Sequence, residues 1–90
     1  MQQEPIRVYR RSWCEDSDAA VEYFRSVGIE YTEIDIEEDA GAGKGVEFIT
    51  GGHHMTPTLL YLMHSIVFDP WDEPRFRRWW GIVSAQEDAG

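Results

Sequence analysis

Hydrophobic and polar positions change their period along the first part of the chain. Residues 5–10 alternate with a period of two and include three strand-forming side chains, which predicts a strand. From Cys14 onward the period becomes helical, acidic residues fill the first turn, and Gly28 supplies a C-terminal stop. The apolar positions of this helix are Ala20, Val21, Phe24 and Val27. Residues 31–36 alternate again, so the pattern predicts two parallel strands joined by a right-handed helical crossover.

Four more elements are predicted in the second half of the chain. In order, they are a helix over Lys44–Ile49 that stops at Gly51, a strand over Thr58–Leu62, a short strand over Ile66–Phe68, and a helix from an Asp72 cap to Gly81. Asp39 is a candidate cap for the first of these helices, although glycines at 41, 43 and 45 weaken its start. The two strands are expected to form a hairpin connected by residues 63–65.

The order β-α-β-(α)-β-β-α with a four-stranded mixed sheet is typical of a thioredoxin-like α/β sandwich. We expect one domain over residues 1–83, followed by a flexible tail at 84–90. This order alone does not define a function, because one fold supports many chemistries.

Composition and charge exclude several functional classes. A formal net charge of −9 argues against a nucleic-acid partner, which would require clustered positive charge. The N-terminus lacks the pattern of a signal peptide, and the longest apolar stretch, residues 59–68, is too short to span a membrane. We therefore expect a cytoplasmic monomer. No zinc-site spacing links the histidines at 53, 54 and 64 to the cysteine, so no metal is expected.

The single cysteine, Cys14, stands where the first predicted strand passes into the first helix. A thiolate at this place receives free backbone N–H groups and the positive end of the helix dipole, which lower its pKa and make it a nucleophile. The alternative is a small buried hydrophobic residue, but the neighbouring Glu15, Asp16 and Ser17 are polar. Thr56 and Pro57 lie directly before the predicted strand over residues 58–62. A proline at the start of a strand is ordinary, and its peptide bond is usually trans.

Several motifs in the correct order resemble one family. They are Val8–Cys14, Gly28–Tyr31, Glu33–Ile36 and Gly51–Thr58. Together they resemble the glutaredoxin family, and most closely its small branch that includes the mycoredoxins and the NrdH-like redoxins. The likeness extends from about Ile6 to Trp80, which covers nearly the whole domain.

The resemblance implies a role for each matching position. Cys14 matches the nucleophilic cysteine, Pro57 matches the cis-proline that lies against the sulfur, and Thr56 matches the residue whose backbone pairs with the bound thiol peptide. Residues 68–72 occupy the place of a glycine-rich turn that holds the other end of glutathione. The other positions expected to contact substrate or small thiol are Arg11, Trp13, Ser17, His54, Asp69 and Trp71.

The sequence departs from the family pattern in three ways. Ser17 replaces the second cysteine of the usual CxxC motif, so no resolving thiol is available within it. Glu15 and Asp16 stand between the two positions, and Phe68 and Trp71 replace the glycine pair of the late turn. Helix amides, Arg10 and Arg11 favour a Cys14 thiolate while the two carboxylates oppose it, so the direction of the pKa shift is left open.

The expected function is that of a monothiol thiol–disulfide oxidoreductase. Cys14 attacks a mixed disulfide on a protein or small thiol, and a low-molecular-weight thiol of the glutathione or mycothiol type then releases it. The acidic residues are expected to repel glutathione and to favour a neutral sugar-based thiol. No tightly bound cofactor is expected. Two alternatives remain: an iron–sulfur cluster binding or transfer protein, and a redox-fold adaptor with little turnover.

Overall fold

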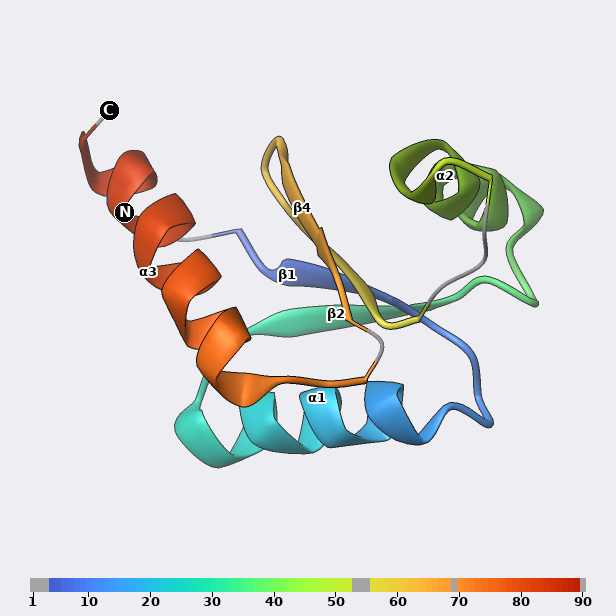
Figure 1. Ribbon diagram of the computed structural model, residues 1–90, viewed down its shortest axis with the longest axis horizontal. Helices are drawn as coiled ribbons and strands as arrows, with labels where there is room; N and C mark the ends of the chain where they lie inside the picture. The colour runs from blue at the N-terminus through green and yellow to red at the C-terminus, as the bar shows by residue number, and fades with distance from the viewer. Residues whose placement is uncertain (1–3, 53–55, 69, 90) are drawn as a thin grey trace.

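The computed structural model describes residues 4–52, 56–68 and 70–89. The elements are β1 (Ile6–Arg10), α1 (Glu15–Val27), β2 (Tyr31–Asp35), α2 (Ala40–Thr50), β3 (Thr58–Tyr61), β4 (His64–Val67) and α3 (Glu73–Ala89). The four strands form one sheet in the order β2-β1-β3-β4 (Figure 1). β1 pairs with β2 in parallel, and the β1–β3 and β3–β4 pairs are antiparallel. The predicted α/β thioredoxin-like fold with a mixed four-stranded sheet is confirmed.

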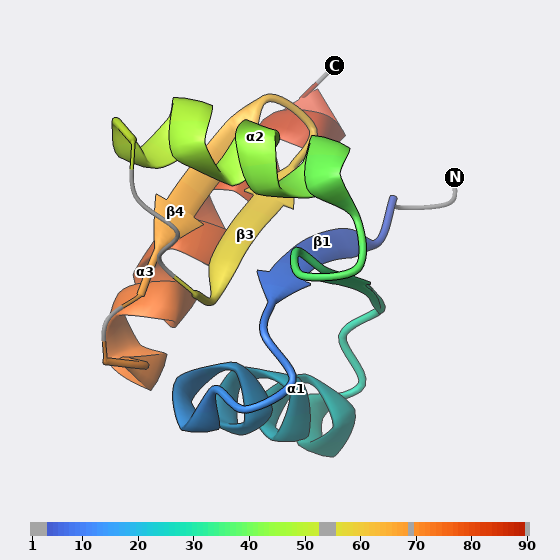
Figure 2. The ribbon, with the colours of Figure 1, turned by 90° about the vertical axis from the view of Figure 1, so that its right-hand side faces the viewer.

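The main core lies between one face of the sheet and the helices α1 and α3. It is formed by alternate residues of β1 and β3, by one face of each helix, and by Phe68 in the loop after β4. The fully buried aromatic side chains of this core are Phe24, Tyr61, Phe68 and Phe76. Figure 2 shows α2 on the side of the sheet opposite α1, where Val46 is buried. The central strand β3 is therefore covered on both faces.

Helix α2 starts earlier than the sequence predicts. It begins at Ala40 rather than Lys44, because the Asp39 carboxylate accepts a hydrogen bond from the Ala42 N–H at 3.1 Å. This cap satisfies an N-terminal donor and offsets the low helix propensity of the glycines. The predicted stop is confirmed, since Gly51 adopts the left-handed conformation at φ 78°.

The hairpin turn is shorter than predicted. Tyr61 pairs with His64, so only Leu62 and Met63 connect β3 to β4. Leu62 has φ 55°, a conformation that two-residue hairpin turns require and that glycine or asparagine usually supplies. The longer connection was expected because the second strand was predicted to start at Ile66, whereas β4 starts at His64.

The last helix continues past Gly81. Asp72 caps α3 as predicted, accepting a hydrogen bond from the Arg75 N–H at 3.1 Å. The predicted end at Gly81 is wrong, and residues 84–89, expected to form a loose tail, belong to the helix. Glycine inside a helix costs about 1 kcal/mol relative to alanine. The buried side chain of Val83, only 3% exposed, compensates by extending the core contact one turn further.

Candidate active site

The Cys14 side chain lies at the junction between β1 and α1. The connecting loop is closed by a hydrogen bond from the Cys14 N–H to the Arg11 carbonyl at 3.2 Å. Cys14 is the N-cap of α1, with φ −90° and ψ 112°, and its carbonyl accepts from the Asp18 N–H at 3.1 Å. Within the described part of the chain the Cys14 side chain makes no capping bond. The N–H groups of the first helical turn are therefore available to the sulfur.

Thr56 and Pro57 lie beside this sulfur, although they are 42 residues further along the chain. The Cys14 thiol donates to the Thr56 carbonyl over an Sγ–O distance of 3.4 Å. The Thr56–Pro57 peptide bond is cis, the isomer expected from the sequence resemblance. The Pro57 carbonyl accepts from the Phe68 N–H at 3.0 Å, which joins this turn to the loop after β4. Three site residues expected from the sequence therefore meet at one place.

Ser17 lies one turn into α1 and is fully buried. Its Oγ has no hydrogen-bond partner of standard geometry among the described residues. The Cys14 thiol hydrogen is directed at Thr56, and a protonated sulfur is only a weak acceptor. A thiolate is a much better acceptor. The Ser17 hydroxyl is thus placed to donate when Cys14 ionises.

The pKa of the Cys14 thiol is lowered from its ordinary value of 9.0. Burial, the largest single influence, raises this pKa because partial desolvation disfavours the charged form. The hydroxyls of Ser17 and Thr56 and the backbone N–H groups of Ser17 and Asp16 outweigh burial, because each stabilises the negative sulfur. The shift in the pKa of Cys14, whose direction the sequence left open, therefore favours the thiolate.

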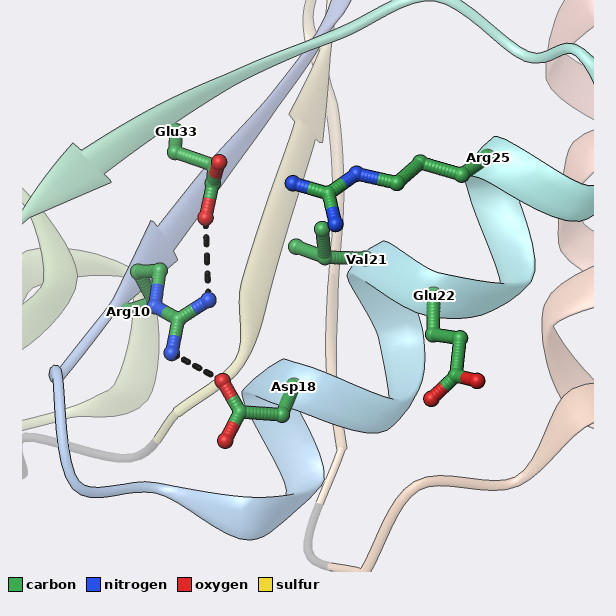
Figure 3. A pocket seen from close by; sticks show the side chains of 6 residues that line it. All are labelled: Arg10, Asp18, Val21, Glu22, Arg25 and Glu33. Atoms are coloured by element: carbon green, nitrogen blue, oxygen red, sulfur yellow. Dashed lines mark hydrogen bonds and ion pairs between the residues drawn. The ribbon is translucent and has the colours of Figure 1, made fainter.

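Contrary to expectation, the arginines are not among the groups that lower the pKa of Cys14. The Arg10 guanidinium lies between two carboxylates, donating to Glu33 at 2.9 Å and also to Asp18 (Figure 3). Arg11 lies over the ring of Trp13, 5.2 Å from its centroid. The charge of Arg10 is consequently neutralised by residues of α1 and β2.

A pocket of about 350 Å³ adjoins the Arg10 ion pairs, between α1 and the parallel strands (Figure 3). Its lining residues are Arg10, Asp18, Val21, Glu22, Arg25 and Glu33. The charges of these side chains largely balance, and Cys14 is not among them.

Trp71 reaches the site through its backbone rather than its ring. Its N–H donates to Asp16 Oδ1 at 3.2 Å, which joins the loop before α3 to the first turn of α1. Its partly buried ring packs against the core, 4.7 Å from Phe68 and 5.6 Å from Phe76 between centroids. The Trp71 ring, which was expected to contact substrate or small thiol, therefore packs largely against the protein core. Phe68 is likewise a core residue, not a surface residue of a ligand-binding turn.

The remaining predicted residues divide into two groups. Trp13 is 65% exposed beside Cys14, with Arg11 over its ring. His54 and Asp69 lie outside the described residues. The sequence analysis considered Asp16 as a charge near the sulfur and missed its hydrogen bond to the Trp71 N–H. The one sequence signal for such a bond is the position of Asp16 in the first turn of a helix.

A comparison with protein families gives the site its context. The family model of glutaredoxins matches residues 6–59, a segment that includes Cys14, Thr56 and Pro57. The chain belongs to the glutaredoxin family. Family membership supports thiol–disulfide redox chemistry for this glutaredoxin and, in general, disulfides and glutathione-type thiols as its reactants.

Solved structures of similar proteins agree on the fold. A mutant of the thioredoxin-like protein BC3987 superposes with a TM-score of 0.71 at 19% identity, covering 83% of this chain and 92% of that chain. A glutaredoxin from Archaeoglobus fulgidus gives a TM-score of 0.68 at 18% identity, covering 81% of this chain and 82% of that chain. No curated protein sequence matches this glutaredoxin significantly.

No group of three or more histidine, cysteine, aspartate or glutamate residues suited to a metal ion occurs in the ranges that the structure describes. Across the same ranges, no helix has both the length and the apolar character needed to cross a bilayer.

Proposed function

We propose that this glutaredoxin reduces mixed disulfides by a monothiol mechanism with Cys14 as the nucleophile. The observation that carries the proposal is the placement of the Cys14 sulfur at the start of α1, 3.4 Å from the Thr56 carbonyl, with its pKa lowered by hydroxyl and N–H donors. A lower pKa raises the fraction of thiolate near neutral pH, and the thiolate is the attacking form.

In the first step the Cys14 thiolate attacks one sulfur of a disulfide that joins a protein to a small thiol. A new bond forms between Cys14 and the small thiol, and the protein sulfur leaves as a thiolate that takes a proton from water. In the second step a second small thiolate attacks the small-thiol sulfur of the adduct. The products are the small-molecule disulfide and the regenerated Cys14 thiolate, so one free small thiol is consumed for each protein thiol released.

The second step needs an external thiol because the chain has one cysteine and Ser17 stands one helical turn away from it. We propose that the external thiol is a low-molecular-weight thiol of the glutathione or mycothiol type. Thr56 positions the backbone of the incoming substrate, and the exposed Trp13 with Arg11 contributes to the surface beside the sulfur.

Intact mass measurement of adducts tests the proposal. The reduced protein is incubated separately with the disulfide forms of glutathione and mycothiol, and each adduct is then exposed to the corresponding free thiol. We expect one adduct per chain that the free thiol removes, and none in the Cys14→Ser variant, which removes the nucleophile. An unreactive Cys14 would contradict the proposal and favour an adaptor role. A brown dimeric protein would instead favour cluster binding.

A further inference from the structure

A hydrogen bond between Asp16 and Trp71 joins the first turn of α1, the helix that Cys14 caps, to the loop before α3. Asp16 is two residues after the nucleophile, and Trp71 is 55 residues further along, in the loop that leads into α3. The bond is partly buried and 3.2 Å long. The Trp71 ring also packs on Phe68, so both the backbone and the side chain of Trp71 are held by the protein.

A backbone N–H close to a helix N-terminus is a favourable donor for an anionic group. In this protein the donor at Trp71 is already occupied by a carboxylate of the chain itself. An anionic substituent on a substrate disulfide could use this N–H only by displacing Asp16. The displaced carboxylate would then lose its hydrogen bond and stand close to a like charge, and both effects oppose binding.

We propose that Asp16 is a specificity-determining residue, which occupies the Trp71 N–H and thereby disfavours disulfides that carry carboxylates near the reacting sulfur. Neutral disulfides, which make no demand on this donor, are the favoured substrate class. The inference rests on the proposed thiol–disulfide exchange at Cys14 and names the substrates of that same site.

The neighbouring Glu15 provides a matched control. Its side chain is exposed, and among the described residues it forms no hydrogen bond or ion pair. Glu15→Gln therefore removes one negative charge beside Cys14 without freeing the Trp71 N–H. Asp16→Asn removes the charge but keeps an oxygen that can accept from Trp71. Asp16→Ala removes both the charge and the acceptor.

The experiment compares two disulfides in the same protein. Rate constants for adduct formation on Cys14 are measured with glutathione disulfide, which is anionic, and with bis(2-hydroxyethyl) disulfide, which is neutral, in the wild type and the three variants. Because both reagents meet the same sulfur, a change in its nucleophilicity largely cancels from the ratio of the two rates. A merely structural role for Asp16 would slow both reactions together and leave this ratio unchanged.

We expect Asp16→Ala to shift the ratio toward glutathione disulfide by about ten-fold, the lower end of what a hydrogen bond to a charged group supplies. Asp16→Asn and Glu15→Gln should each shift it by no more than about two- to three-fold, and 0.5 M salt should remove most of that smaller shift because it arises from charge alone. Equal shifts in all three variants would overturn the inference, since charge rather than occupancy would then set the preference. If Asp16→Ala does not fold, Asp16→Asn provides the test. A shift of the rate ratio by about ten-fold in a folded Asp16→Asn protein would overturn the inference, because this variant keeps the acceptor for the Trp71 N–H.

The failures of the two proposals can be told apart. If wild-type Cys14 forms an adduct with neither disulfide, the proposed exchange reaction is wrong. If it reacts with both and the ratio does not respond to Asp16→Ala, the exchange reaction stands and only the role of Asp16 is wrong.

Discussion

Replacement of the buried Ser17 by alanine separates the reactivity of Cys14 from the stability of the fold. In the thiol form the Ser17 hydroxyl is fully buried and has no hydrogen-bond partner among the described residues. In the thiolate form it is a donor that lowers the pKa of Cys14. The Ser17→Ala variant should therefore behave differently in the two ionisation states.

The magnitudes follow from these two environments. A hydrogen bond to a charged group contributes about 1.5–3 kcal/mol, so losing the Ser17 donor should slow alkylation of Cys14 at neutral pH by at least about ten-fold. A buried polar group without a partner costs about 1–3 kcal/mol. Removing the Ser17 hydroxyl should therefore leave the free energy of unfolding of the thiol form unchanged or raise it by about 1 kcal/mol.

Two measurements check this prediction. Alkylation by iodoacetamide is followed between pH 5 and pH 10, and the midpoint of the rate profile should move upward in Ser17→Ala. Urea unfolding at pH 5, where Cys14 is protonated, gives the stability, and the same pair of proteins in a Cys14→Ser background controls for the thiol. An unchanged alkylation profile would refute the assigned donor role. A stability loss above about 2 kcal/mol would show that Ser17 supports the fold directly.

Three further predictions concern charge, burial and pH. Because the folded pKa of Cys14 is depressed, its thiolate stabilises the fold fully above the unfolded value of 9.0, and this contribution is lost as pH falls through the folded pKa. In urea unfolding, the stability difference between wild type and Cys14→Ser should therefore grow as the pH rises from the folded to the unfolded pKa of Cys14. Below the folded pKa this difference should not change with pH. Arg10→Met should cost about 1–2 kcal/mol at low salt, because the Arg10 side chain is only 12% exposed and its loss leaves Asp18 and Glu33 unpaired; a cost that does not fall in 1 M salt would contradict the ion-pair explanation. Phe24→Ala should cost about 3–5 kcal/mol in thermal or urea unfolding, since the Phe24 ring is fully buried, and a loss below 1 kcal/mol would mean that the core can collapse around the gap.

The sequence predicts the order of the elements because each has a clear period and an end signal. Gly28 and Gly51 end α1 and α2 as expected, and Asp72 caps α3. The errors occur where tertiary packing overrides local propensity. Gly81 reads as a stop, yet burial of Val83 carries the helix onward.

For the site, the resemblance to glutaredoxins identifies Cys14, Thr56 and Pro57, which the fold brings together. The partners of Asp16 and Arg10 could not be predicted in the same way. The Asp16 bond joins residues 55 positions apart, and the Arg10–Glu33 pair joins residues 23 apart, so both depend on loop and side-chain geometry that periodicity does not encode. Arg10 was expected to stabilise the Cys14 thiolate, whereas in the structure it pairs with Asp18 and Glu33.

The presence of serine at position 17 has a consequence for the electrochemistry of this glutaredoxin. A protein with two thiols in its motif can store an electron pair as an internal disulfide and so has a reduction potential of its own. This chain contains one cysteine, and every oxidised form that is a disulfide includes a second molecule. Its apparent potential is therefore a joint property of Cys14 and the partner thiol, and at fixed partner it moves by about 30 mV for each ten-fold change in the ratio of oxidised to reduced species, as for any two-electron couple. A potential measured against one small thiol will not apply to another, and the fraction of protein held as adduct reports the state of the surrounding thiol pool.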